Sequence, residues 1–298
     1  MTLKQLVAWA KDKTRFRSVE DYASFCEEYL GFIYTGLQAV IVSQNENQYR
    51  FFQYKEDGNF NVSRPINSNL MVGCEDFGEI KDNFCYALHH IREITAMDDI
   101  RHQINKFVYT CQQAIGATLD ALPAGESNIA RKINGDLFER YIRFIISEIG
   151  ISVREGTVSV PVVVDGEELF KMAYQHDLIV EKSRGHEVRA IGSVKTSSKD
   201  RMDKIFIDKF LYNRLTNVSI PHFAVFLNDV QRKGREPNFG VNTTFLTGHF
   251  KGYTIKLNPL DGVYYCDLRP NMLTDDILKE QIRLLDCLLV EDIWRFIE

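Results

Sequence analysis

The sequence predicts a mixed α/β fold of the α+β kind, in which a mixed central β-sheet is flanked by helices. A mainly helical N-terminal region that contains a hairpin is expected to precede this sheet. Two observations support the prediction. After residue 126, the segments follow one another as helix, three strands, helix and strand, and PHFAVFLNDV (221–230) is a continuous apolar run typical of a strand buried on both faces.

The N-terminal part combines helices with short strands. Residues 1–30 are expected to be helical, with Ser18 as an N-cap, and LQAVIVSQ (37–44) and QYRFFQYK (48–55) are expected to be strands. Asp57-Gly58 is a hairpin signal. Helical periodicity from about 80 to 122 ends at PAGESN (123–128), a predicted linker, so the expected domains are 1–125 and 126–298.

The second part is expected to begin with a helix over 135–150, capped by Asn134. Three strands follow up to about residue 196, and an amphipathic helix over 200–215 leads to the buried strand. More strands are predicted within 242–257 and 262–268, and a closing helix is predicted from about 274.

Composition and charge exclude some classes of protein. The 298 residues are 45% hydrophobic and carry a net charge of −5, and no apolar run is long enough to predict a membrane span. The N-terminus has no pattern of a signal peptide, and the 6 cysteines show no tight pairing, so a cytoplasmic protein is expected.

Positive charge is concentrated in one segment of this acidic chain. Residues 182–214 hold 9 lysines and arginines against 4 acids, a local balance of +5. Such a patch is typical of a phosphate-bearing partner, and a solvated charged surface is the alternative.

Acidic and basic side chains are expected to meet where two strands of the sheet end. Alternation places Ser193 and Lys195 on one face of their strand, and Asp177 lies on the preceding strand of the same predicted hairpin. On the following helix, Arg201, Lys204 and Asp208 are spaced i, i+3, i+7 and share one face.

This arrangement resembles the PD-(D/E)XK nuclease superfamily over about 100 residues. The resemblance places the first acid of the family at Asp177 and its lysine at Lys195, whereas Ser193 stands where the second acid is usual. The branch of restriction endonucleases that includes EcoRII and NgoMIV departs in the same way. Its second acid comes from the next helix, which implies Asp208 here, and the helix before the sheet implies a contribution from Glu139.

The same branch has a basic-acidic-basic triplet after the lysine, which recognises G·C pairs. Here the triplet matches Lys199, Asp200 and Arg201, with lysine in place of the first arginine. Cations can pair with guanine O6 and N7, and a carboxylate can accept from the cytosine amino group. The remaining DNA contacts are expected at Ser193, Lys204 and three hydroxyls that could also cap the helix, those of Thr196, Ser197 and Ser198.

The chemistry of these side chains agrees with phosphodiester hydrolysis. Mg²⁺ prefers oxygen ligands, which Asp177 and Asp208, with Glu139, would supply. Lys195 would orient the attacking water and offset the charge that grows in the transition state. Structural roles stay open: Asp208 could be a solvated helix position, Glu139 could pair with Arg143, and His176 is expected to be a packed residue.

The predicted function is that of a prokaryotic type II restriction endonuclease, which cuts double-stranded DNA at a short G·C-containing site. Cutting both strands of a palindrome requires two active sites, so a homodimer is expected, with residues 1–125 serving dimerisation or DNA grip. The alternatives are a structure-selective or repair nuclease of the same superfamily, or a DNA-binding module on a decayed nuclease core. Ser193, which stands where the second acid is usual, supports the DNA-binding module.

Overall fold

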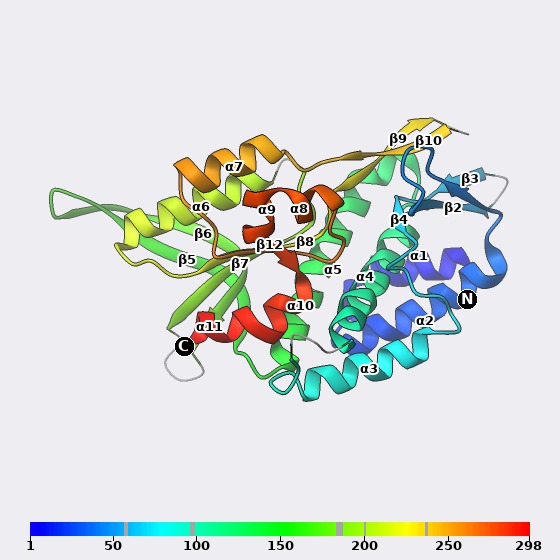
Figure 1. Cartoon of the computed structure of the whole chain (residues 1–298), viewed down its shortest axis with the longest axis horizontal. Coiled ribbons are helices and arrows are strands. Elements are labelled where there is room, and N and C mark those ends of the chain that lie inside the picture. The colour runs from blue at the N-terminus through cyan, green and yellow to red at the C-terminus, as the bar shows by residue number, and fades with distance from the viewer. Residues whose placement is uncertain (57–58, 96–98, 183–186, 200, 236–237) are drawn as a thin grey trace. The chain divides into compact units, whose positions relative to one another are not determined.

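The structure is a computed structural model that describes residues 1–56, 59–95, 99–182, 187–199, 201–235 and 238–298 (Figure 1). Two compact units form. Unit 1 comprises Met1–Ile145 and Asp229–Thr244, and unit 2 comprises Ile146–Asn228 and Phe245–Glu298. The predicted boundary at residues 125 and 126 follows the change of sequence pattern, whereas the units meet within a helix at Ile145 and Ile146.

Unit 1 contains helices, a small antiparallel sheet in the order β1-β2-β3 with β4 also paired to β2, and a separate two-stranded hairpin. Its elements are α1 (Leu3–Lys11), α2 (Val19–Gly36), β1 (Ala39–Val42), β2 (Tyr49–Glu56), β3 (Asn59–Val62), β4 (Ile66–Asn67), α3 (Phe77–His89), α4 (Ile100–Leu119), most of α5 (Ser127–Glu148), β9 (Val230–Arg235) and β10 (Asn238–Thr243).

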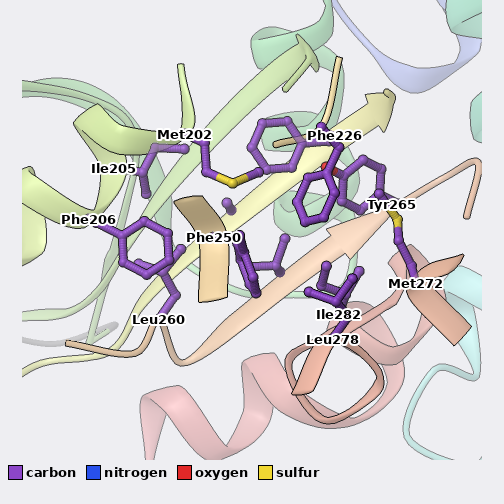
Figure 2. Packing of buried hydrophobic residues seen from close by; sticks show 13 residues of the cluster. Met202, Ile205, Phe206, Phe226, Phe250, Leu260, Tyr265, Met272, Leu278 and Ile282 are labelled. Carbon is purple, nitrogen blue, oxygen red and sulfur yellow. The ribbon is translucent and has the colours of Figure 1, made fainter. Parts of the chain in front are cut away.

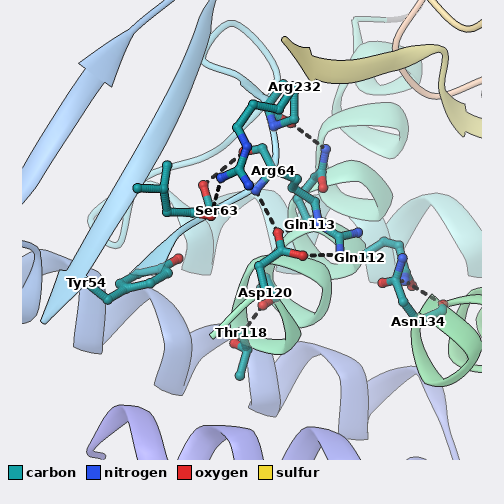
Figure 3. A network of polar contacts seen from close by, with 12 residues as sticks. Tyr54, Ser63, Arg64, Gln112, Gln113, Thr118, Asp120, Asn134 and Arg232 are labelled. Atoms are coloured by element: carbon teal, nitrogen blue, oxygen red, sulfur yellow. Dashed lines mark hydrogen bonds and ion pairs between the residues drawn. The ribbon is translucent and has the colours of Figure 1, made fainter. Parts of the chain in front are cut away.

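Helix α4 is the centre of unit 1, because every residue from 107 to 119 is buried. At its end, Asp120 accepts two hydrogen bonds of 2.9 Å from the guanidinium of Arg64 (Figure 3). Both side chains are partly buried, which is tolerable because each charge has a partner. The pair therefore fixes the chain before β4 to the end of α4.

Two helix predictions for unit 1 are wrong in detail. The expected helix over 80–122 is two helices, because α3 packs its apolar face on α4, with Phe84 stacked on Phe107 at 4.2 Å between ring centroids. Asn134 does not cap a helix. Helix α5 begins earlier, at Ser127, and Asn134 is buried within it, where its side-chain oxygen accepts a 3.0 Å hydrogen bond from Gln112. A buried amide bond thus replaces the expected cap.

Unit 2 has a six-stranded sheet in the order β12-β11-β8-β7-β6-β5. Strands β5 to β7 form an antiparallel meander, and β7, β8, β11 and β12 are parallel. The elements are β5 (Val153–Val164), β6 (Glu167–Glu181), β7 (Val188–Ser197), α6 (Met202–Thr216), β8 (His222–Asn228), α7 (Thr247–Lys256), β11 (Gly262–Tyr265), α8 (Pro270–Thr274), α9 (Asp276–Gln281), β12 (Ile282–Leu284), α10 (Leu285–Cys287) and α11 (Ile293–Ile297).

The predicted mixed sheet flanked by helices is confirmed. Strand β8 is buried along its whole length, as its apolar run predicts. On one face, Phe226 belongs to a core that also contains Phe206 of α6 and Phe250 of α7 (Figure 2). On the other face, Phe223 stacks on Phe296 of α11, with 5.7 Å between ring centroids. Helices therefore cover both sides of the central strand.

Two segments of unit 2 differ from the prediction. Much of 242–257, expected to be strands, is helix α7, because Phe250 and Tyr253 lie one helical turn apart and both contact Phe206. The closing helix from about 274 is interrupted, because Ile282–Leu284 pair with β11 as an added edge strand. None of the helices in the described ranges is long and apolar enough to cross a membrane.

Candidate active site

The carboxylate of Asp177 and the amine of Lys195 meet where β6 and β7 run side by side in unit 2. Lys195 Nζ lies 2.5 Å from Asp177 Oδ2, and the backbone N–H of Val194 donates to the same oxygen over 2.8 Å. The two side chains keep 18% and 25% of their surface exposed. A charge-assisted pair of this kind is oriented by the backbone and still accessible to a ligand.

A β-bulge lies beside this pair. Across β5 and β6, Gly156 pairs with His176 while Arg154 pairs with Ile179, so one residue of β5 faces two residues of β6, Asp177 and Leu178. Such an extra residue breaks the regular alternation and redirects a side chain. The bulge lies on the β5 side of Asp177; on the β7 side Leu178 pairs with Gly192, so Asp177 falls opposite Ser193 and reaches Val194 and Lys195.

Gly192 allows β7 to lie close to its neighbours. A Cβ atom at this position would lie 2.5 Å from Phe223 Cζ of β8 and 3.0 Å from Leu178 Cδ1 of β6. Both distances are shorter than van der Waals contact, so a larger residue would displace β7 or its neighbours. The glycine thus helps to fix the strand that presents Lys195.

Asp208 lies on α6 and forms an ion pair with Lys204 one turn earlier on the same helix. The carboxylate of Asp208 is 17% exposed, whereas Lys204 is 65% exposed. Burial lowers the pKa of His176, and the nearby charge of Asp208 opposes this shift. Burial also raises the pKa of Tyr174, and Asp208 adds to that increase. Asp208 therefore acts electrostatically on β6, the strand that carries Asp177.

The three predicted metal ligands do not all belong to the same unit. Asp177 and Asp208 both belong to unit 2, whereas Glu139 lies on α5 in unit 1. Within the described residues, no group of three or more His, Cys, Asp or Glu side chains is arranged to hold a metal ion. Two carboxylates are nevertheless a chemically suitable donor set for Mg²⁺, which prefers oxygen ligands and retains several waters.

The residues predicted to contact DNA lie at the end of β7 and the start of α6. Ser193, Thr196 and Ser197 are half-buried, Ser198 is buried, and Lys199 and Arg201 are exposed, while Asp200 lies outside the described residues. The predicted capping of α6 by the hydroxyls is wrong. The N-cap is Arg201, without a side-chain capping bond, and Ser197 Oγ instead accepts a 3.1 Å bond from the N–H of Lys199. Because β7 continues to Ser197, this hydroxyl closes a local turn.

Two members of the basic segment have structural roles. Lys209 is buried on α6, where its amine donates to Asp261 at 2.7 Å and to the carbonyl of Pro259 at 2.6 Å. Arg189 donates to the backbone oxygen of Glu298 at 2.6 Å and also pairs with Glu187. The surface available to a phosphate-bearing partner is therefore smaller than the sequence count indicates.

Two buried histidines also belong to this region, and sequence analysis missed one of them. His176 is packed, as expected, with its ring stacked 6.1 Å from that of Tyr174. His222 begins β8, and its burial lowers its pKa to about 4, so its ring is neutral near pH 7. Its Nδ1 contacts the carbonyl oxygen of Ile220 at 3.0 Å. The buried environment of His222 is evident only from the residues that surround it in the folded sheet, and no sequence pattern indicates it.

Comparison with solved structures supports the same class of fold. The chain is similar to the crystal structure of the type IIP restriction endonuclease Kpn2I, with a TM-score of 0.70 and 14% identity over 99% of this chain and 97% of that chain. A complex of the restriction endonuclease PspGI with substrate DNA matches with a TM-score of 0.44 and 13% identity over 74% of this chain and 92% of that one. No protein-family model matches the sequence, and no curated protein matches it. The first likeness shows that the chain has a restriction-endonuclease fold.

Proposed function

We propose that this protein is a type II restriction endonuclease that hydrolyses phosphodiester bonds of double-stranded DNA at a short G·C-containing site. The observation that carries the proposal is the pair of Asp177 and Lys195, 2.5 Å apart, at the strand positions that the resemblance to PD-(D/E)XK nucleases implies. The fold shared with Kpn2I supports it. In this proposal the enzyme acts as a homodimer in the cytoplasm of a prokaryotic cell.

Asp177 and Asp208 would hold Mg²⁺, and Glu139 is a further candidate ligand. When bound, the ion would supply a water of lowered pKa and offset negative charge on the scissile phosphate. Lys195 would orient the attacking water by donating to it, because Asp177, itself held by the N–H of Val194, fixes the amine. The positive charge of Lys195 would also stabilise the more highly charged transition state.

Recognition is proposed to use the triplet Lys199, Asp200 and Arg201. Lys199 and Arg201 are exposed and precede the first turn of α6, four and six residues after Lys195. Their donors suit guanine O6 and N7, and the carboxylate of Asp200 suits the cytosine amino group. Ser193, Thr196, Ser197, Ser198 and Lys204 would contact the backbone of the DNA.

The test of the proposal is digestion of a sequenced plasmid by the purified chain, with and without Mg²⁺. Discrete fragments that share one terminal sequence are expected with Mg²⁺ only. Asp177→Asn should abolish cutting because an amide is a poorer metal ligand, while the matched control Glu280→Gln, on an exposed residue, should cut normally. Cutting without a common sequence, or only at junctions or damaged sites, would favour a structure-selective or repair nuclease.

A catalytically decayed DNA-binding module is the second candidate, and Ser193 at the usual position of the second acid is the observation that favours it. This candidate predicts that the chain binds DNA with the same affinity in Mg²⁺ and in EDTA and cuts no substrate. The retained pair of Asp177 and Lys195 argues for the enzyme instead.

A further inference from the structure

The hairpin of β9 and β10 has two chemically distinct faces. Its register pairs Arg235 with Asn238, Lys233 with Gly240 and Gln231 with Asn242. Directly paired residues share a face of an antiparallel ribbon, and alternate residues share it along each strand. One face therefore carries the polar side chains of these pairs, and the opposite face carries Val230, Arg232, Phe239 and Val241.

The apolar face attaches the hairpin to the small sheet of unit 1. Val230, Phe239 and Val241 are buried in one cluster with Tyr49 and Phe51 of β2, and the rings of Phe51 and Phe239 lie 5.5 Å apart. Burial of each large apolar side chain contributes about 1.5–3 kcal/mol. The ribbon is consequently held in place within unit 1.

Backbone contacts strengthen this attachment. The N–H of Gln44 donates to the carbonyl of Phe239 at 3.0 Å. The amide of Asn45 accepts from the N–H of Val241 at 2.9 Å and donates to its carbonyl at 2.8 Å. At Gly240, a Cβ atom would lie 2.7 Å from Asn45 Oδ1, so glycine permits this approach. Gln44 Nε2 also donates to Asn238 Oδ1 at 2.7 Å, so Gln44 and Asn45 contact the β10 part of the polar face, and Lys233 and Arg235 of β9 stay exposed.

The outward face carries donors and positive charge. Lys233, Arg235, Asn238 and Asn242 are exposed, and neither Lys233 nor Arg235 pairs with a carboxylate among the described residues. Arg232 differs from them. Its guanidinium donates to the carbonyl of Val62 at 2.9 Å and lies over the ring of Phe239. Residues 236–237, at the tip, lie outside the described part of the chain.

We infer that the outward face of the β9–β10 hairpin binds the phosphate backbone of duplex DNA through Lys233 and Arg235. This inference rests on the proposed function. The chain as a whole carries a net charge of −5. The ribbon nevertheless presents two cations side by side, and such a local concentration of positive charge attracts a polyanion. The hairpin follows β8 directly in sequence.

Counterion release gives the size of the effect. Each phosphate contact contributes about 0.9 to the slope of log K against log salt concentration for duplex DNA. Loss of two contacts should reduce this slope by about 1.8 per protomer and weaken binding at 0.1 M salt by about 60-fold relative to a 1 M reference.

The experiment compares Lys233→Gln/Arg235→Gln with Lys4→Gln/Arg17→Gln, which removes the same charge from exposed residues elsewhere in unit 1. Binding of the full chain to a fluorescent 30-base-pair duplex is measured in EDTA, where no cleavage occurs, between 50 and 300 mM salt. At 0.1 M salt the hairpin variant should bind about 60-fold more weakly for each protomer that contacts the duplex, with the slope reduced by about 1.8 per protomer, and the control should stay near the wild type. Circular dichroism checks that both variants are folded.

The outcomes separate this inference from the proposed function. If the wild type cuts plasmid but the hairpin variant matches the control in affinity and slope, the inference is overturned and the nuclease proposal stands. If DNA binding depends on the hairpin but the wild type never cuts, the inference stands and the nuclease proposal fails. An equal loss of binding to duplex RNA of the same length would indicate a general polyanion surface and overturn the assignment to DNA.

Discussion

Replacing Lys195 with alanine tests the core of the candidate site. Lys195 touches Asp177 at 2.5 Å, but Asp177 also accepts from the N–H of Val194, so its carboxylate keeps one partner in the variant. Both side chains retain part of their exposure, and the free energy of unfolding should therefore fall by about 1 kcal/mol or less. Loss of one cation near phosphate should weaken DNA binding by about tenfold at most.

Cleavage should respond far more strongly than binding. Removing one group that stabilises transition-state charge costs about 10²–10³-fold in rate, and loss of water orientation adds to this. The assays are single-turnover cleavage with Mg²⁺, binding in EDTA and urea unfolding, each with Lys4→Ala as the matched surface control. Equal losses in binding and cleavage would make Lys195 a DNA contact only, and normal cleavage by Lys195→Ala would refute the site.

Four further predictions concern other positions. Asp208→Ala should abolish cleavage, and Asp208→Ala combined with Ser193→Glu should recover part of it with Mg²⁺ or Mn²⁺; unchanged activity of the single variant would exclude Asp208 as a ligand and favour another carboxylate. Arg201→Ala should weaken binding to the cognate site by about 1–3 kcal/mol and relax preference at one G·C position, whereas an equal loss on all sequences would make it a phosphate contact. Gly192→Ala should lower the unfolding free energy by about 1–3 kcal/mol and slow cleavage, as urea titration and rate measurements can show, because β7 must shift. Asp120→Ala should lower the unfolding free energy by about 2–4 kcal/mol by leaving the guanidinium of its partner unpaired, with the salt dependence of cleavage unchanged.

The central sheet could be predicted because its sequence signals are local and strong. The continuous apolar run that forms β8 and the alternating pattern that forms β7 each indicate a strand. The segment of α7 misled prediction because its aromatic and β-branched residues favour strands in isolation. Packing of Phe250 and Tyr253 against Phe206 decided for a helix, and such contacts connect residues more than 40 positions apart.

The polar residues of unit 1 show a similar limit. Asn134 lies where a helix could begin, and its residue type is favoured at N-caps. In the structure its amide is satisfied by Gln112, a buried residue of another helix, and α5 continues through it. Sequence patterns cannot distinguish a cap from a buried tertiary hydrogen bond, because both satisfy the same amide.

The acid–lysine pair of the candidate site follows from alternation, but an irregularity beside it does not. In the register of β6 with β7, Leu178 pairs with Gly192, so Asp177 falls opposite Ser193 and on the face that also carries Lys195. On the β5 side, the bulge opposite Glu155 inserts one residue into β6, so His176 and Ile179 pair with residues only two positions apart on β5. The spacing between acid and lysine in the sequence is therefore consistent with contact across β6 and β7, whereas no sequence pattern indicates the bulge between β5 and β6. A bulge beside the paired charges, in a strand that is paired on both sides at Ile179 and Val180, is a local departure of the kind found next to functional side chains.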